Sequence, residues 1–358
     1  MPQPAPDVAA PGRCIVVNTA IYLHGTSGSA TATRALVGAL RALDDVAVHE
    51  AAPARRGGRS SVLNAVRDAR WDLWQASRSR PAVDLLVSPC NVGLRGAARR
   101  HLLVLHDVMP FDRPELFDRR YGAYFRLLVP RSVRSADRVL TLSEHTAQAA
   151  RRMAPGADVR VVAWAAPGVG TGRAAFPSRL VVLMVGATEP VKNQVAGIEA
   201  VAMLRRSSGA NVGLRVVGPA GRAEPVVRAA LEAADPTGAW TIREVDVPAA
   251  ELDRAYAGAW LLLQPSLDEG FGLPLVEAAR HGLPAVHSGR GAMPTVMPQV
   301  DAGDVTVHAL AGAMERLLDE DLWRAAADAA LDRARAFEPD AFRATVRAEV
   351  SDLLPERR

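Results

Sequence analysis

Two glutamates eight positions apart, Glu269 and Glu277, bound the segment of this chain whose residue types could do chemistry. The segment reads Glu-Gly-Phe-Gly-Leu-Pro-Leu-Val-Glu and follows the apolar run Trp260 to Gln264. Pro274 fits the first turn of a helix and Gly282 fits its C-terminal cap. We therefore expect a strand, a glycine-rich loop and a helix of about two turns, with Glu277 in the first helical turn.

The start of the predicted helix is suited to bind a diphosphate. Unpaired amides and the positive end of the helix dipole make a helix N-terminus an anion site, and Gly270 and Gly272 let a phosphate approach the backbone. The carboxylates of Glu269 and Glu277 can accept hydrogen bonds from sugar or ribose hydroxyls. The alternative is that Glu277 only complements the helix dipole and Glu269 is a solvated loop charge.

Lys192 is the only lysine among the 43 lysine and arginine residues of the chain. An ammonium is a compact charge and a guanidinium is a wide planar fork, so a tight phosphate site can distinguish them. Lys192 ends the stretch Val-Gly-Ala-Thr-Glu-Pro-Val-Lys that begins at Val185 and opens with a predicted strand end. A cation there would neutralise a leaving diphosphate. Chance survival of one lysine is the alternative.

The segment from Pro265 to Pro284 resembles the E-x7-E motif of retaining glycosyltransferases of the GT-B fold, in the glycogen-synthase-like group numbered family four. The resemblance implies that Glu277 binds the donor ribose and that Glu269 acts at the donor sugar. It implies further donor-binding residues, namely Gly186, Asn193, Gly270, Phe271, Gly272, Leu273 and Pro274. The Lys192 stretch is similar to the family's Gly-Thr-Leu-Glu-Pro-Arg-Lys-Asn variant.

This chain departs from the family pattern in that no arginine follows Gly186, where many members carry a second phosphate-binding cation. Arg222, in Gly-Pro-Ala-Gly-Arg, is a candidate replacement. The Glu-Pro-Val-Lys-Asn variant slightly favours GDP-mannose over UDP or TDP sugars as the donor.

In the first half of the chain, His106 and Asp107 follow the apolar run Leu102 to Leu105. They resemble the family's His-Asp strand end, whose histidine contacts the donor sugar, and a structural histidine is the alternative. The loop Gly25, Thr26, Ser27 and Gly28 does not match G-x-G-x-x-G, but its amides could approach a phosphate or the acceptor. Ser143 is expected to cap a helix.

These residues need parallel strands to position them, and apolar runs alternate with helix-like stretches throughout the chain. Expected strands are Arg13 to Leu23, Val83 to Val87, Leu102 to Leu105, Arg138 to Leu142, Leu180 to Val185, Gly213 to Val217, Trp240 to Val245, Trp260 to Gln264 and Pro284 to His287. The first helix is expected over Thr33 to Leu43. We expect an α/β protein of the GT-B fold, with two doubly wound, Rossmann-like domains facing each other across an interdomain cleft.

The expected domain organisation has five parts. Residues 1–12 form a disordered leader, 13–168 an acceptor-side domain, 169–179 a linker and 180–338 the nucleotide-sugar-binding domain. Residues 339–358 contain a helix that could pack on either domain.

The composition and net charge of the chain argue against several other classes of protein. A net charge of +4 with dispersed arginines does not require a nucleic-acid partner. No segment offers the roughly 18 apolar residues of a membrane span. Cys14 and Cys90 are expected to be two buried reduced thiols, which favours the cytoplasm. The only Asp-x-Asp, at Asp319 and Asp321, sits in an amphipathic pattern, so neither a metal nor another cofactor is expected.

One helical stretch leaves a membrane contact open. Tyr121, Tyr124, Phe125 and Leu128 share a helical face, with arginines elsewhere, which suits peripheral contact with the inner membrane surface. A buried helix face explains the pattern equally well.

Together the residues predict an enzyme that transfers a hexose from a nucleotide diphosphate sugar to a hydroxyl acceptor, such as a glycan, a lipid-linked intermediate or a natural product. The family resemblance implies retention by front-face departure, with Glu269, His106 and Lys192 as the catalytic residues. The alternatives are a nucleotide-sugar hydrolase or epimerase on the same fold, and a non-catalytic sugar-nucleotide binding module.

Overall fold

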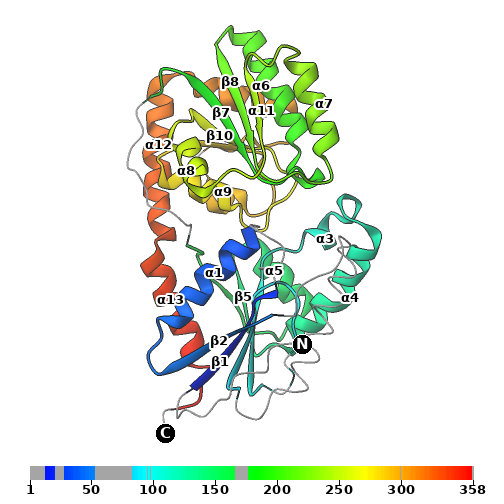
Figure 1. Ribbon diagram of the computed structural model, residues 1–358, viewed down its shortest axis with the longest axis vertical. Helices are drawn as coiled ribbons and strands as arrows, with labels where there is room; N and C mark the ends of the chain where they lie inside the picture. Colours follow the sequence, from blue (N-terminus) through cyan, green and yellow to red (C-terminus); the bar gives the residue numbers. More distant parts are fainter. Residues whose placement is uncertain are drawn as a thin grey trace. The chain divides into compact units, whose positions relative to one another are not determined.

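The computed structural model describes residues 13–20, 28–52, 83–94, 96, 98–165, 176–298 and 300–356. The chain divides into two compact units (Figure 1). The first unit comprises Met1–Ala165 and Glu338–Arg358, and the second comprises Ala166–Phe337. The C-terminal helix thus belongs to the first unit. The predicted leader, and most of the predicted linker, lie outside the described residues.

The first unit is built on a six-stranded parallel sheet in the order β2-β1-β3-β4-β5-β6. The strands are β1 (Arg13–Asn18), β2 (Val46–Ala51), β3 (Leu85–Ser88), β4 (Arg100–Leu105), β5 (Arg138–Thr141) and β6 (Val159–Val161). Strands β4 and β5 are almost wholly buried, as expected for a sheet covered on both faces. The run predicted over Arg13 to Leu23 is a strand over Arg13–Asn18; Thr19 and Ala20 lie outside the strand, and the last three residues of the run lie outside the described residues.

The helices that the structure describes in the first unit are α1 (Gly28–Arg41), α3 (Met109–Asp112), α4 (Arg119–Ser135), α5 (Glu144–Met153) and α13 (Pro339–Ser351), with the 3-10 turn η2 (Pro114–Leu116). Helix α1 begins five residues before the predicted start at Thr33, so that prediction was wrong. Ala30 and Ala32 are buried in the extra turn, and the Thr33 hydroxyl donates to the carbonyl of Ser29 at 2.8 Å. Burial of small residues outweighs the turn propensity of the Gly-Ser sequence.

The apolar face predicted for α4 is only partly exposed. Phe125 is buried and stacks edge-on against Phe111, with ring centroids 5.4 Å apart, and Tyr121 packs against Phe125. The aromatic side chains of α4 therefore contribute to the core of the first unit.

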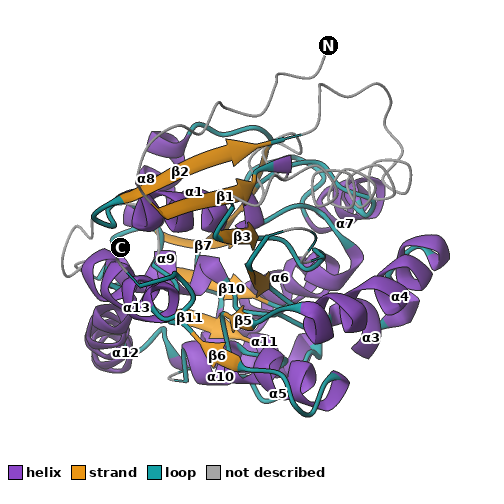
Figure 2. Cartoon of the chain, turned by 90° about the horizontal axis from the view of Figure 1, so that it is seen from below, coloured by secondary structure: helices purple, strands orange, loops and turns teal. Residues whose placement is uncertain are grey.

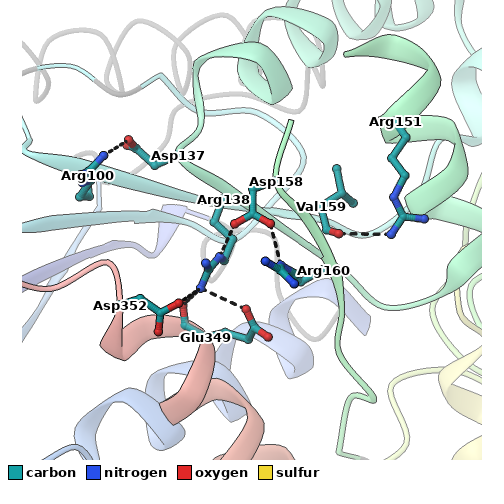
Figure 3. A network of polar contacts seen from close by, with 9 residues as sticks. All are labelled: Arg100, Asp137, Arg138, Arg151, Asp158, Val159, Arg160, Glu349 and Asp352. Carbon is teal, nitrogen blue, oxygen red and sulfur yellow. Dashed lines mark hydrogen bonds and ion pairs between the residues drawn. The ribbon is translucent and has the colours of Figure 1, made fainter. Parts of the chain in front are cut away.

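Helix α13 runs beside α1 (Figure 1) and is tied to the sheet by Arg138 (Figure 3). The Arg138 side chain is only 8% exposed. Its Nε donates to Asp158 Oδ2 at 2.8 Å, while its Nη1 donates to Asp352 Oδ2 at 3.1 Å and to the Glu349 carbonyl at 2.6 Å. One guanidinium thus joins β5, the residue before β6 and the last turn of α13.

The second unit holds a five-stranded parallel sheet in the order β11-β10-β7-β8-β9, whose strands lie between helices (Figure 2). The strands are β7 (Leu180–Val185), β8 (Val212–Val217), β9 (Thr241–Glu244), β10 (Leu261–Gln264) and β11 (Ala285–His287). The helices are α6 (Gln194–Ser208), α7 (Glu224–Ala234), α8 (Ala249–Ala257), α9 (Leu273–Arg280), α10 (Met293–Val296), α11 (Val307–Arg316) and α12 (Glu320–Ala334), with the 3-10 turns η3 (Pro190–Lys192) and η4 (Arg335–Phe337).

Three other predictions can be compared with the structure. Asp319 is the N-cap of α12, and its side chain accepts from the amides of Asp321 and Leu322. Both cysteines are free thiols, but only Cys14 is buried, so the expectation that Cys90 is buried was wrong. No helix among the described residues has the length and apolar character needed to cross a membrane.

Candidate active site

The segment between β10 and β11 forms the strand, loop and helix that its sequence predicts. Helix α9 spans Leu273–Arg280, is capped by Gly272 in the left-handed region at φ +87°, and carries Pro274 in its first turn. Glu277 is the fifth residue of this helix, so it lies in the second turn and not in the first as predicted. Its carboxylate is too far along the helix to act as a simple first-turn dipole partner.

The start of α9 presents unpaired backbone donors. Within the described residues, no hydrogen bond uses the amides of Phe271, Gly272 or Leu273, and no side chain caps the helix. Such donors at the positive end of a helix favour an anion. The Phe271 ring is buried and packs edge-on against the Phe337 ring, and this contact holds the loop in place.

Glu269 is a buried carboxylate with one crowded oxygen. Its Oε1 accepts from Lys192 Nζ at 2.6 Å, from Gln264 Nε2 at 2.5 Å and from Ser266 Oγ at 2.7 Å. Within the described part of the chain its Oε2 accepts no hydrogen bond. The three donors hold the carboxylate in one orientation and leave one oxygen for a ligand hydroxyl.

Lys192 reaches Glu269 because the two loops that carry them are joined. The Asn193 side-chain amide donates to the Pro265 carbonyl at 3.1 Å, and the Leu267 amide donates to the Val191 carbonyl at 2.8 Å. The predicted donor ligand Asn193 thus has a structural contact in this state. The Lys192 side chain passes over Gly186, where an added Cβ would lie 3.7 Å from Lys192 Cε.

A second loop closes behind Glu269. Gly291 has φ +60°, and a Cβ added there would lie 2.3 Å from Asp268 Oδ1 and 2.4 Å from the Glu269 carbonyl. The Ala292 amide donates to that carbonyl at 2.8 Å. Only glycine fits at position 291, and its close approach fixes the backbone at Glu269.

Glu277 is held from the preceding helix. The hydroxyl of Tyr256, on α8, donates to Glu277 Oε2 at 2.6 Å. Burial raises the pKa of Glu277, and the Tyr256 hydrogen bond opposes that rise without cancelling it. Burial, together with the neighbouring carboxylate of Glu277, also raises the pKa of Tyr256 well above its usual range, so Tyr256 is the donor in this pair.

Arg222, the candidate second cation, lies in the loop after β8 and is bound to the loop after β7. Its Nε donates to Glu189 Oε2 at 2.7 Å, and its side chain is 49% exposed. The same two loops are linked by Thr188, whose hydroxyl accepts from the Gly221 amide and donates to Glu224. Arg222 is thereby anchored to the loop that ends at Lys192.

His106 ends the first unit's strand β4 and is buried. Its Nε2 lies 2.6 Å from the Pro89 carbonyl, which can only accept, so Nε2 carries the hydrogen. Burial lowers the pKa of His106 to about 4, against the opposing effect of the Pro89 hydrogen bond. The ring is therefore neutral near pH 7, and its Nδ1 is an acceptor. Next to it, Asp107 Oδ1 accepts from the Met109 amide at 3.2 Å.

The structure thus brings together Lys192, Glu269 and the start of α9 in the second unit, while His106 and Asp107 belong to the first unit. Of the loop at 25–28, Gly25, Thr26 and Ser27 lie outside the described residues, and Gly28 opens α1. Ser143 caps α5 as predicted, because its hydroxyl accepts from the Thr146 amide at 3.2 Å.

Three residues around the glutamates were missed by the sequence analysis. Gln264 and Ser266 could have been found, since both are polar residues at the end of an apolar strand, where ligand-binding residues gather in parallel sheets. Tyr256 has no such signal, because it lies inside a helix.

Comparisons with known proteins agree with this geometry. A family model described as "Family 4 Glycosyltransferase in conflict systems" matches residues 130–351. The chain is 27% identical over 280 residues to the O-antigen chain mannosyltransferase B of Escherichia coli, covering 71% of each protein.

Solved structures of similar fold include two proteins with low sequence identity. Sucrose-phosphate synthase from Thermosynechococcus elongatus superposes with a TM-score of 0.77 at 16% identity, over 95% of this chain and 99% of that one. Anabaena Alr3699/HepE in complex with UDP and glucose superposes with a TM-score of 0.71 at 16% identity, over 95% and 100% of the two chains. These similarities establish the GT-B fold. Because the family model spans more than half of the chain, this protein belongs to the family 4 glycosyltransferases.

Proposed function

We propose that the protein transfers a hexose from a nucleotide diphosphate sugar to a hydroxyl acceptor with retention at the anomeric carbon. The observation that carries the proposal is the contact of Lys192 with Glu269 beside the unpaired amides that open α9. A cation, a row of N–H donors and a carboxylate in one place are suited to a diphosphate that is linked to a sugar. The Anabaena structure with UDP and glucose supports a donor of this class.

Lys192 can serve the leaving group without giving up Glu269. An ammonium has three N–H donors, and within the described residues Glu269 is its only hydrogen-bond partner. The remaining donors are available to the diphosphate, while Glu269 Oε2 accepts from a sugar hydroxyl. Neutral His106 contributes Nδ1 as a second acceptor for the donor sugar.

The proposed transfer uses front-face departure. The bond between the anomeric carbon and the phosphate oxygen breaks, and a bond to the acceptor oxygen forms on the same face. The acceptor proton passes to the departing phosphate oxygen, whose charge Lys192 and the α9 amides stabilise. No group of the protein has to act as a base in this step.

The donor that we propose is GDP-mannose. The Escherichia coli relative is a mannosyltransferase, and the Glu-Pro-Val-Lys-Asn stretch ending at Asn193 leans to the same donor. A thermal-shift screen with GDP-mannose, UDP-glucose and TDP-glucose tests the choice, because a ligand that binds the native state raises its apparent stability. A larger shift with a UDP or TDP sugar would replace GDP-mannose in the proposal.

The reaction class is tested by following nucleotide diphosphate release with and without hydroxyl acceptors. Transfer predicts slow release from donor alone and fast release with the right acceptor, and the anomeric proton of the product should show the configuration of the donor. Rapid release from donor alone would instead identify a nucleotide-sugar hydrolase. Binding without turnover over a broad acceptor panel would identify a binding module.

Helix α4 supports a peripheral contact with an anionic membrane as part of this proposal. Its exposed face carries five arginines and no acidic residue, namely Arg119, Arg120, Arg126, Arg131 and Arg134. Within the described residues none of the five arginines forms an ion pair. The neighbouring Leu127 side chain is also exposed, at 53%. A basic face of this kind attracts anionic lipids, and the exposed leucine can enter the headgroup region.

The membrane contact is tested by sedimentation with vesicles. Binding to phosphatidylglycerol vesicles should exceed binding to phosphatidylcholine vesicles, should weaken in high salt, and should be lost in an Arg120→Glu/Arg126→Glu/Arg134→Glu variant. Equal binding to the two vesicle types, or salt-independent binding, would remove this part of the proposal.

A further inference from the structure

Helices α8 and α9 are joined by a two-step ladder of polar contacts. In the inner step, the Tyr256 hydroxyl donates to Glu277 Oε2 at 2.6 Å. In the outer step, His281 Nε2 lies 3.1 Å from Asp253 Oδ1. The rings of Tyr256 and His281 stack with an interplanar angle of 8° and centroids 5.7 Å apart. Asp253 and Tyr256 lie one turn apart on α8, and Glu277 lies about one turn before His281, the C-cap residue of α9.

The two steps differ in their surroundings. Tyr256 is only 3% exposed, whereas the Asp253 side chain is 47% exposed. A hydrogen bond from a buried hydroxyl to a carboxylate is worth more than a surface contact, and it fixes the acceptor's orientation. The inner step therefore sets the position of the Glu277 carboxylate, and the outer step serves helix docking.

One oxygen of Glu277 is free for a ligand. Tyr256 occupies Oε2, and within the described residues Oε1 has no hydrogen-bond partner. Glu277 is partly exposed, so Oε1 can be reached by a hydroxyl group. If Tyr256 did not occupy Oε2, the carboxylate could rotate and meet the ligand with either oxygen.

We infer that Tyr256 is a positioning residue that holds Glu277 so that its Oε1 accepts a hydroxyl of the donor ribose, and that this pair makes the enzyme select ribonucleotides. The inference rests on the proposed function, in which Glu277 binds the ribose. Tyr256 itself does not touch the nucleotide. Its removal should therefore weaken binding only of ligands that carry the ribose hydroxyls.

The test measures dissociation constants of the full chain for GDP and 2′,3′-dideoxy-GDP, with UDP and 2′,3′-dideoxy-UDP as a second pair. The wild type should prefer the ribonucleotide by about ten- to a hundredfold, the range for a hydrogen bond to a charged group. Tyr256→Phe should lose about tenfold in affinity for the ribonucleotide and little for the dideoxynucleotide. Asp253→Asn, which weakens only the outer step, should keep the wild-type preference.

A double-mutant cycle separates positioning from a general loss of structure. In a Glu277→Ala background, Tyr256→Phe should no longer change the preference for the ribonucleotide, since the side chain that it positions is gone. An equal loss for both nucleotides in Tyr256→Phe would overturn the inference and assign Tyr256 a structural role only. So would a Tyr256→Phe effect that is as large with Glu277→Ala as without it.

Failure of the proposed function gives a different result. A wild type that binds neither nucleotide contradicts the assignment of a nucleotide donor itself. A wild type that binds both nucleotides equally leaves that assignment standing but overturns the ribose role of Glu277, and the role of Tyr256 with it.

Discussion

Lys192 Nζ lies 2.6 Å from Glu269 Oε1, and this contact joins two loops that are 77 positions apart in the chain. The hydrogen bonds from Asn193 to the Pro265 carbonyl and from Leu267 to the Val191 carbonyl hold the loops in register. The Lys192 side chain is only 22% exposed, so its position depends on these neighbours more than on solvent. The compact ammonium fits between Gly186 and Glu269, where a planar guanidinium would need more room.

Replacing Lys192 should therefore show that its shape matters as well as its charge. Lys192→Ala should lower turnover by about 10²–10³, the usual effect of removing one group that stabilises a developing negative charge. Turnover should also fall by at least about tenfold in Lys192→Arg, because the wider guanidinium cannot occupy the same space as the ammonium. Steady-state kinetics of folded variants measure both effects.

Arg206→Lys is the matched control for this exchange, since it swaps the two cations in the other direction at an exposed position in the last turn of α6. We expect its turnover to stay close to wild type. Wild-type turnover in Lys192→Arg would show that the single lysine of the chain has no geometric role, and near-normal turnover in Lys192→Ala would contradict the site assignment.

Glu277→Gln should lower the activity of the enzyme but raise the stability of the protein without ligand. Burial raises the pKa of Glu277, so the folded state binds its proton more readily than the unfolded state. Stability is therefore lost as pH rises from the unfolded pKa through the higher folded one. The uncharged amide removes this loss, and its oxygen can still accept from Tyr256. In urea unfolding without ligand, the free energy of unfolding of the variant should rise relative to that of the wild type between pH 4 and pH 7.

Glu232→Gln, an exposed substitution on α7, is the control and should leave the pH dependence of stability unchanged. A Glu277→Gln variant that is less stable than the wild type at pH 7 would mean that the charge of Glu277 stabilises the apo protein.

The sequence predicted the parts of the fold that are buried, because buried parallel strands read as continuous apolar runs. All five strands of the second sheet overlap the predicted segments, to within a residue or two at each end, and these include β9, a half-exposed edge strand whose run Thr-Ile-Arg-Glu still gave a local signal. Strands β2 and β6 were not predicted. They lie at the two edges of the first sheet and are short or half-exposed, as Val-Arg-Val at Val159–Val161 illustrates.

The candidate site was predictable wherever its residues are close in sequence. The loop and helix from Glu269 to Glu277 follow from local glycine and proline chemistry. The contact between Lys192 and Glu269 does not, because it depends on loops that only the sheet order β10-β7 brings together. Tyr256 was missed for the same reason: no local pattern connects a tyrosine within a helix to a carboxylate 21 positions later.

Buried His106 should make the first unit sensitive to acid. Its pKa falls from 6.5 to about 4 on burial, so its contribution to stability is complete above pH 6.5 and is lost as pH falls toward 4. The loss is about 3 kcal/mol over that window. His106→Gln should flatten this part of the stability profile, because glutamine can donate to the Pro89 carbonyl without a charged form. Urea unfolding at a series of pH values measures the difference.

His49→Gln provides the comparison, since His49 is a partly exposed histidine on edge strand β2 of the same unit. Its profile should follow that of the wild type. If His106→Gln and the wild type lose stability in parallel between pH 6.5 and 4, the burial of His106 does not govern the acid response.

Arg138 should be the residue on which the attachment of α13 depends most (Figure 3). Removing one partner of a buried ion pair leaves the others desolvated and unpaired, which costs about 3–5 kcal/mol when all are buried. Here the acids are partly exposed, with 65% exposure at Asp352 and 22% at Glu349, so Arg138→Met should cost about 2–3 kcal/mol. Urea unfolding measures the cost, and limited proteolysis should release α13 sooner.

Arg335→Met is the matched control for that substitution. Its guanidinium is 79% exposed and lies 3.2 Å from Asp332, so its loss should cost less than about 1 kcal/mol. A second variant, Asp352→Asn, removes one acid and leaves Arg138 with Asp158 and Glu349, so it should cost less than Arg138→Met. If Arg138→Met costs no more than Arg335→Met, α13 is held by its apolar face, where Phe342 packs against Trp164 with ring centroids 4.8 Å apart, and not by the ion pairs.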